Sequence, residues 1–232
     1  MKRYAAAIIS LACVMIAGTV RAQEPEVKLQ IPQFALTRPT LLRGAQLFVN
    51  HCLSCHTLKY LRYSRVGEDL GLTEAQVKRM LMLPANAEYN KTMTNTMQAR
   101  EAAKWFGTAP PDLTLEARYR GTDWIYTYLK SFYLDTSAPL GWNNHLFPHA
   151  AMPNVLAPLG GIRDIQSHLI RQGSLNAEQF DTTVADITAW LKYTSDPSRL
   201  QRYALGIWVL PFLVVLSVLA YLLKRVYWRR IH

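Results

Sequence analysis

The apolar residues of this chain recur mainly at the spacing of an α-helix, three or four residues apart. The clearest runs are Leu41–Val49 and Val184–Leu191, and weaker runs cover residues 73–83, 97–106 and 122–133. Amphipathic helices bury such an apolar face against one another. The pattern therefore predicts a mainly α-helical fold.

Start and stop signals delimit these helices. Pro39 suits the first turn of the first helix, Thr73-Glu74-Ala75-Gln76 is a capping box, and Gly107 suits a helix end. Either Asn176 or Asp181 would cap the last helix before the apolar C-terminal segment. The signals thus agree with the apolar pattern on where helices begin and end.

Two stretches lack a helical pattern. Residues 27–37 contain Pro32 and predict an extended segment that leads into the first helix. Residues 134–161 are rich in Pro, Gly and Asn, and a loop of that length inside a domain is usually functional. A further group of apolar and aromatic residues is expected to form the wall of a pocket: Leu58, Tyr60, Leu61 and Tyr63.

The N-terminal pattern predicts a secretory signal peptide over residues 1–22. A basic start is followed by the uncharged apolar run 5–20, and small residues precede Gln23, where the mature chain would begin. A retained anchor is the alternative, although the run is short for a membrane span. Lipidation at Cys13 is a second alternative, but the residues before it form a poor lipidation signal.

A second apolar run, Tyr203–Leu223, contains 21 residues without a charge. At a rise of 1.5 Å per residue such a helix spans about 30 Å, the thickness of a membrane's hydrocarbon core. We assign residues 198–225 to a transmembrane anchor and 226–232 to a basic tail. The short basic end should stay in the cytoplasm, which places residues 23–197 in the periplasm. A buried core helix is the alternative.

The net charge of +10 reflects these two ends more than the domain between them. Seven of the 26 basic residues lie in the signal peptide or just beyond the apolar run. Between positions 23 and 202 the chain has 19 basic and 16 acidic residues, a difference of +3. This near balance argues against a nucleic-acid-binding surface.

The candidate chemistry lies in Cys52-Leu53-Ser54-Cys55-His56. A Cys-x-x-Cys-His run attaches a c-type haem: each thiol forms a thioether to one vinyl group, and the histidine that follows becomes an iron ligand. A redox dithiol would need a strand–helix unit around it, and a zinc site would need further ligands at close spacing. The sequence favours one covalent haem c per chain.

The second axial ligand decides the class of function, because an open iron binds small molecules whereas two strong ligands restrict a haem to electron transfer. Met152 lies in the proline-stiffened Ala151-Met152-Pro153, and spacing favours it while leaving His145 and His149 open. The other candidates are less suitably placed: His51, Met80, Met82, Met93, Met97 and His168.

Four segments give the chain a resemblance to a known family. They are Arg43–Phe48 with Cys52–His56, then Pro110–Leu113 followed by Arg118 and Arg120, then Ala151–Pro153, and finally Trp190–Tyr193 with Asp196-Pro197 and a single terminal span. In this order they resemble cytochrome c1, the haem subunit of bacterial ubiquinol–cytochrome c reductase, the cytochrome bc1 complex. The resemblance covers nearly the whole mature chain and implies a c-type cytochrome domain with one C-terminal transmembrane helix.

The resemblance implies site roles residue by residue. Cys52 and Cys55 look like the thioether sites, His56 like the proximal iron ligand and Met152 like the distal one. Pro110 and Pro111 look like the haem-pocket wall. Arg120 looks like the residue beside a haem propionate, with Arg118 as its rival. Some bacterial relatives brace the segment before the methionine with a disulfide. Here no cysteine is left for one, so packing and hydrogen bonds must fix the Met152 loop.

In c-type folds the helix before the haem crosses the last helix of the domain. The resemblance therefore implies that Gly44 and Phe48 meet Trp190 and Tyr193. It would explain a glycine within a helix, where glycine costs about 1 kcal/mol relative to alanine. A merely tolerated helix glycine is the alternative.

The implied function is outer-sphere electron transfer within a quinol–cytochrome c oxidoreductase, in which this chain alone is an electron carrier. Electrons would arrive from the Rieske iron–sulfur protein and leave to a soluble or membrane-bound c-type cytochrome. Cytochrome b would be a further partner, in the bacterial inner membrane. Two other functions stay open: another membrane-anchored electron carrier, and a haem peroxidase or gas sensor with an open iron site.

Overall fold

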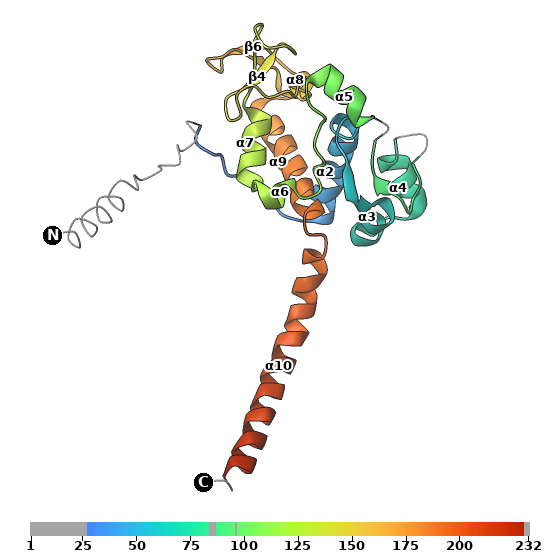
Figure 1. The fold of residues 1–232 in the computed structure, drawn as a ribbon, viewed down its shortest axis with the longest axis vertical. Coiled ribbons are helices and arrows are strands. Elements are labelled where there is room, and N and C mark those ends of the chain that lie inside the picture. Colours follow the sequence, from blue (N-terminus) through green and yellow to red (C-terminus); the bar gives the residue numbers. More distant parts are fainter. Residues whose placement is uncertain (1–26, 84–86, 96, 230–232) are drawn as a thin grey trace, which may run out of the picture.

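Helices make up most of the regular structure in the computed structural model, which describes residues 27–83, 87–95 and 97–229. A helical domain carries one long helix, α10 (Arg199–Trp228), that extends away from it (Figure 1). The prediction of a mainly α-helical fold with one C-terminal apolar helix is confirmed. The predicted signal peptide at 1–22 lies outside the described residues.

The domain contains helices of unequal length and three small antiparallel strand pairs. The helices are α2 (Arg38–His51), α3 (Tyr63–Leu70), α4 (Glu74–Leu81), α5 (Ala99–Phe106), α6 (Glu116–Tyr119), α7 (Thr122–Lys130), α8 (Ala157–Gly160) and α9 (Ala177–Thr194). The strand pairs are β1 (Leu58–Arg62) with β2 (Thr92–Met93), β3 (Phe132–Leu134) with β4 (Trp142–Asn144), and β5 (Ile162–Arg163) with β6 (Leu169–Arg171).

The start and stop signals named from the sequence are confirmed at α2, α4, α5 and α9. Capping boxes open α4 at Thr73 and α9 at Asn176, which is the cap in preference to Asp181. Gly107 ends α5 in the left-handed conformation, with φ of 78°. These local hydrogen bonds satisfy backbone groups that have no partner within the helix itself.

One predicted helix is shorter than its apolar pattern suggested. The run at 122–133 indicated a helix through Tyr133, but α7 ends at Lys130. Phe132 and Tyr133 belong instead to β3, where they face Asn144 and Asn143 of β4. Backbone pairing with β4 therefore overrides the helical spacing of the apolar residues.

The crossing of α2 and α9 forms the centre of the core, and α9 also packs against α7 (Figure 1). Gly44 of α2 faces the backbone of Asp186 and the Cβ of Trp190 in α9. Phe48 and Tyr193 are buried in the same core. The predicted close approach of the two helices at Gly44 is therefore confirmed. It is possible because glycine has no Cβ atom.

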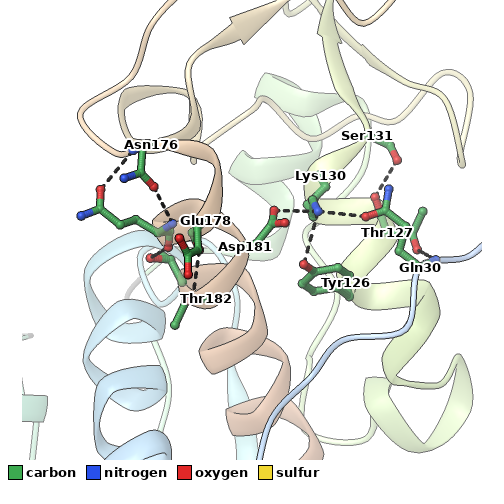
Figure 2. A network of polar contacts seen from close by, with 11 residues as sticks. Gln30, Tyr126, Thr127, Lys130, Ser131, Asn176, Glu178, Asp181 and Thr182 are labelled. Atoms are coloured by element: carbon green, nitrogen blue, oxygen red, sulfur yellow. Dashed lines mark hydrogen bonds and ion pairs between the residues drawn. The ribbon is translucent and has the colours of Figure 1, made fainter.

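A polar network attaches the extended N-terminal segment to the domain (Figure 2). Lys130 Nζ lies 2.7 Å from Asp181 Oδ1 of α9 and donates to Gln30 Oε1 at 2.8 Å and to Tyr126 Oη at 3.2 Å. The backbone N–H of Gln30 donates to Thr127 Oγ1 at 2.8 Å. Three segments distant in sequence thus meet at one lysine, whose side chain is only 17% exposed.

The long helix α10 is the one helix among the described residues whose length and composition suit a membrane span. The stretch concerned, Gln201–Trp228, has 28 residues and its most apolar part is not buried in the domain. A buried core helix, the alternative interpretation of this run, is inconsistent with that exposure. Arg202 pairs with Asp196 at 2.7 Å where the helix leaves the domain.

Candidate haem-binding site

A cavity of about 240 Å³ lies beside the Cys-x-x-Cys-His segment, far larger than the roughly 10–15 Å³ that one water molecule needs. All the site residues named from the sequence line it: Cys52, Cys55, His56, Pro110, Pro111, Arg120 and Met152. Its other walls are mainly apolar or aromatic and include Phe106, Leu113, Trp124, Ile125, Tyr128, Leu129, Phe147, Val155, Ile187 and Leu191. The fold thus brings residues about 100 positions apart to one hollow.

The two cysteines lie where α2 gives way to a tight turn. Cys52 caps α2, and its backbone N–H still donates to Phe48 O at 2.8 Å. The backbone N–H groups of Cys55 and His56 both donate to the carbonyl of Cys52, at 3.1 and 2.8 Å. This turn places both free thiols on the cavity. Burial raises the pKa of the Cys52 thiol to about 12, so the free thiol is neutral.

The imidazole of His56 has one nitrogen engaged with the protein. Its Nδ1 lies 2.9 Å from the carbonyl oxygen of Pro111, and because a carbonyl only accepts, Nδ1 carries the proton and donates. Burial lowers the pKa of His56 and outweighs the opposing effect of that hydrogen bond. The neutral ring therefore keeps an unprotonated Nε2, the form of histidine that binds a metal.

The segment that contains Pro111 is fixed to the chain just after His56. Thr57 and Asp112 form a parallel bridge, in which Leu113 N–H donates to Thr57 O at 2.9 Å. The Asp112 carboxylate accepts from Thr57 Oγ1 at 2.6 Å and from the N–H of Lys59 at 2.8 Å. Burial alone would raise the pKa of Asp112, but these hydrogen bonds lower it overall. An ionised aspartate thus fixes the Pro111 carbonyl at His56.

Met152 reaches the cavity from the long irregular segment between β4 and α8. The Tyr128 hydroxyl donates to its sulfur with an O···S distance of 3.7 Å. Two asparagines of β4 anchor the preceding chain: Asn144 Nδ2 donates to Tyr128 O at 2.8 Å, and Asn143 Oδ1 accepts from His149 N–H at 2.8 Å. Hydrogen bonds thus take the place of a disulfide before Met152, as the sequence predicted.

The sequence pointed to the loop but not to the residues that fix it. In the sequence, Asn143 and Asn144 only add to the polar composition of the loop. In the structure both are buried, where asparagine side chains form hydrogen bonds to the backbone. Trp124 and Tyr128 lie within the predicted helical run 122–133, which by itself assigns neither of them to a site. Their four-residue spacing stacks the two rings with centroids 4.9 Å apart.

The competing axial-ligand candidates do not share the place of Met152. His145 stacks on Tyr133 at 4.3 Å, and neither it nor His149 lines the cavity. His51 does line it, but it is the last residue of α2, next to Cys52. Across residues 27–83, 87–95 and 97–229, no three His, Cys, Asp or Glu side chains gather as a metal site.

Arg120 and its rival Arg118 occupy different positions. Arg120 lines the cavity, with its guanidinium 4.2 Å from the centre of the Trp124 ring, while Arg118 does not line it. Nε of Arg120 also pairs with Glu116 at 2.6 Å. The cation nearest the cavity is therefore a stacked arginine that already has an acidic partner.

One sequence-based expectation about the cavity was wrong. Leu58, Leu61 and Tyr63 are buried in the core, and Tyr60 is 66% exposed. None of the four lines the cavity. The reason is that residues 58–62 form β1, and the register of its pairing with β2 shifts between Leu58 and Arg62. The irregular strand lets both Leu58 and Leu61 reach the core and leaves Tyr60 outside.

A helical domain with a Cys-x-x-Cys-His turn opening on an apolar cavity, and with one apolar helix beyond it, defines a membrane-anchored c-type cytochrome. A model of the cytochrome C1 family matches residues 31–231, and the chain belongs to this family. Members of the family are haem-bearing electron-transfer subunits of the bc1 oxidoreductase complex.

Three relatives show the extent of the similarity. Cytochrome c1 of Allochromatium vinosum is 44% identical over 208 residues, which cover 83% of this chain and 85% of that protein. The ammonia monooxygenase gamma subunit of Nitrosomonas europaea is 39% identical over 228 residues, 96% of this chain and 97% of the relative. Cytochrome c1 of Rhodospirillum rubrum is 27% identical over 252 residues, 92% of each chain.

Proposed function

We propose that this chain is the electron-transfer subunit of ubiquinol–cytochrome c reductase. It would take electrons from the Rieske iron–sulfur protein and pass them to a soluble or membrane-bound c-type cytochrome. The observation that carries this proposal is the presence of Cys52, Cys55, His56 and Met152 on one apolar cavity. These four side chains offer the two thiols, the imidazole and the thioether that a six-coordinate haem c requires.

The residues of the cavity fit that cofactor. Cys52 and Cys55 would form the two thioethers, His56 would use its free Nε2 as proximal ligand, and Met152 would use its sulfur as distal ligand. The haem supplies one-electron chemistry, in which iron alternates between the ferric and ferrous states. Pro110, Pro111 and the aromatic walls would exclude water from the bound haem, which together with methionine ligation favours a high potential.

Both axial positions are filled by this chain's own side chains in the proposal. Met152 lies on a loop that asparagine hydrogen bonds fix in place, so the distal side is closed to small molecules. A peroxidase or gas sensor needs an open position at the iron. Electron transfer is therefore the function that this donor set supports.

Arg120 is proposed as the partner of a haem propionate. It lines the cavity and is stacked on Trp124, so its planar guanidinium is held for a carboxylate. Glu116, which already contacts Arg120, would then share it with the propionate. Arg118 is the weaker candidate, because it does not line the cavity.

The proposed topology follows from the two apolar ends of the sequence. Residues 1–22 would be removed as a signal peptide, and residues 23–197 would form the haem domain in the periplasm. Residues 198–225 would cross the bacterial inner membrane once, with residues 226–232 as a cytoplasmic basic tail. Cytochrome b and the Rieske protein would be its partners in the membrane.

A second candidate function rests on the relative from Nitrosomonas europaea, which carries the name of an ammonia monooxygenase subunit. Under that alternative the same haem site would serve a different membrane complex. The site itself favours neither complex, because the donor set would be the same in both. Membership of the cytochrome C1 family favours the reductase.

The test is the identity of the partner subunits. Membranes that contain the tagged full chain are extracted with a mild detergent, and the proteins that co-purify are identified by mass spectrometry. We expect cytochrome b and a Rieske protein in equal amounts with this chain, and haem reduction on addition of a quinol. Purification with monooxygenase, oxidase or dehydrogenase subunits and without cytochrome b would contradict the proposal.

A further inference from the structure

The hydroxyl group of Tyr128 is directed at the sulfur of Met152. The O···S distance of 3.7 Å lies within the range of hydrogen bonds to sulfur, and both side chains line the cavity. A thioether sulfur only accepts, so the tyrosine is the donor. The contact joins α7 to the loop that carries Met152.

The ring of Tyr128 is fixed on both sides. It stacks on Trp124 with centroids 4.9 Å apart and an angle of 9° between the planes, and Phe132 meets it edge-on at 5.0 Å. The carbonyl of Tyr128 accepts from Asn144, which also orders the start of the Met152 loop. Donor and acceptor are therefore positioned by the same small group of side chains.

The Tyr128 hydroxyl has a single O–H to donate, and its geometry directs that O–H at the Met152 sulfur. Among the described residues its hydroxyl has no other hydrogen-bond partner than the Met152 sulfur. The sulfur in turn has two lone pairs, so one can accept this proton while the other remains available to a metal.

We infer that Tyr128 is a positioning residue that orients the Met152 sulfur and raises the midpoint potential of the bound haem. This inference rests on the proposed function, in which Met152 is the distal ligand. A hydrogen bond draws electron density from the sulfur and makes it a poorer donor. Weaker donation from sulfur destabilises ferric iron more than ferrous iron. The midpoint potential of the haem therefore rises.

The substitution Tyr128→Phe removes one oxygen atom and keeps the aromatic stack. A neutral hydrogen bond changes an equilibrium by up to about tenfold. We expect the ratio of reduced to oxidised protein at a fixed ambient potential to fall by up to about tenfold, which is a drop of about 59 mV for one electron. The far-red sulfur–iron absorption band should persist but move, because the ligand stays while its electron density changes.

Tyr126→Phe is the matched control. Tyr126 lies on the same helix, but its hydroxyl accepts from Lys130 and does not line the cavity. Its substitution should leave both the potential and the band unchanged. Equal potentials in Tyr128→Phe and Tyr126→Phe would overturn the inference.

Met152→Leu separates this inference from the ligand assignment on which it rests. If Met152→Leu keeps the band and the potential, the proposed ligand is wrong, whatever Tyr128→Phe does. If Met152→Leu abolishes the band while Tyr128→Phe matches its control, only the role of Tyr128 is wrong. In the Met152→Leu background, Tyr128→Phe should have no further effect on the potential, because the two changes act through one contact.

Discussion

Gly44 of α2 lies so close to Trp190 of α9 that a Cβ atom on Gly44 would stand 2.8 Å from the Cβ of Trp190. The carbonyl of Asp186 would be closer still. This contact sets the distance between the two helices whose ends reach the cavity, at Cys52 after α2 and at Leu191 in α9. Because glycine has no side chain, α2 can approach α9 closely enough to set the positions of both helices at the cavity.

Gly44→Ala should therefore destabilise the protein. The atoms in the way belong to helix backbone and to the base of a side chain, so overpacking of about 1–3 kcal/mol should outweigh the gain in helix propensity of about 1 kcal/mol. At roughly 2–4 °C per kcal/mol, calorimetry of the detergent-solubilised protein should show a lower Tm. Gly206→Ala, where nothing lies within 4 Å, is the control and should not lower the Tm. Equal effects of the two substitutions would contradict the proposed role of the contact.

Covalent haem should depend on both cysteines of the turn. Cys52→Ser or Cys55→Ser leaves at most one thioether, and the double substitution leaves none, because serine does not add to a vinyl group in this way. Haem staining of a denaturing gel measures the outcome. A stained band from the double variant would refute the attachment site.

Met152→Leu should remove the distal ligand while it roughly preserves the side-chain volume. A thioether favours ferrous iron, so the midpoint potential should fall by a few hundred millivolts, or several kcal/mol at about 1.4 kcal/mol per 59 mV. The far-red sulfur–iron band should disappear and the reduced protein should bind carbon monoxide. Haem should stay covalently attached, since Cys52 and Cys55 are unchanged.

Met97→Leu is the control for that substitution, because Met97 does not line the cavity. It should retain the band, the potential and the resistance to carbon monoxide. The assignment of Met152 fails if these properties survive in Met152→Leu and are lost in Met97→Leu or after a change at His145 or His149.

A chain that ends at Ser198 should be exported, should take up haem and should be soluble. The reason is that α10 is the one described helix suited to a membrane span, and it contributes no residue to the cavity. Fractionation of cells, followed by haem staining of each fraction, measures this. If the shortened holoprotein still sediments with membranes, a second anchor exists. Lipidation at Cys13 would then be the first modification to test.

The sequence determined the local features of this protein because they depend on neighbouring residues. The Cys-x-x-Cys-His turn, the capping boxes at Thr73 and Asn176 and the apolar run of α10 all act over a few positions, so a pattern is enough to predict them. The spacing of residues already favoured Met152, and the resemblance to a family strengthened that prediction and added Arg120. Every site residue named in this way lies on one cavity.

Tertiary structure alone decided what depends on contacts between distant segments. The hydrogen bond from His56 to Pro111 joins residues 55 positions apart, and the one from Tyr128 to Met152 joins a helix to a loop. Likewise, strand pairing shortened α7 and directed Leu58 away from the cavity. A local apolar pattern shows that a residue is buried, but not against what, because the partner's position is fixed only once the chain has folded.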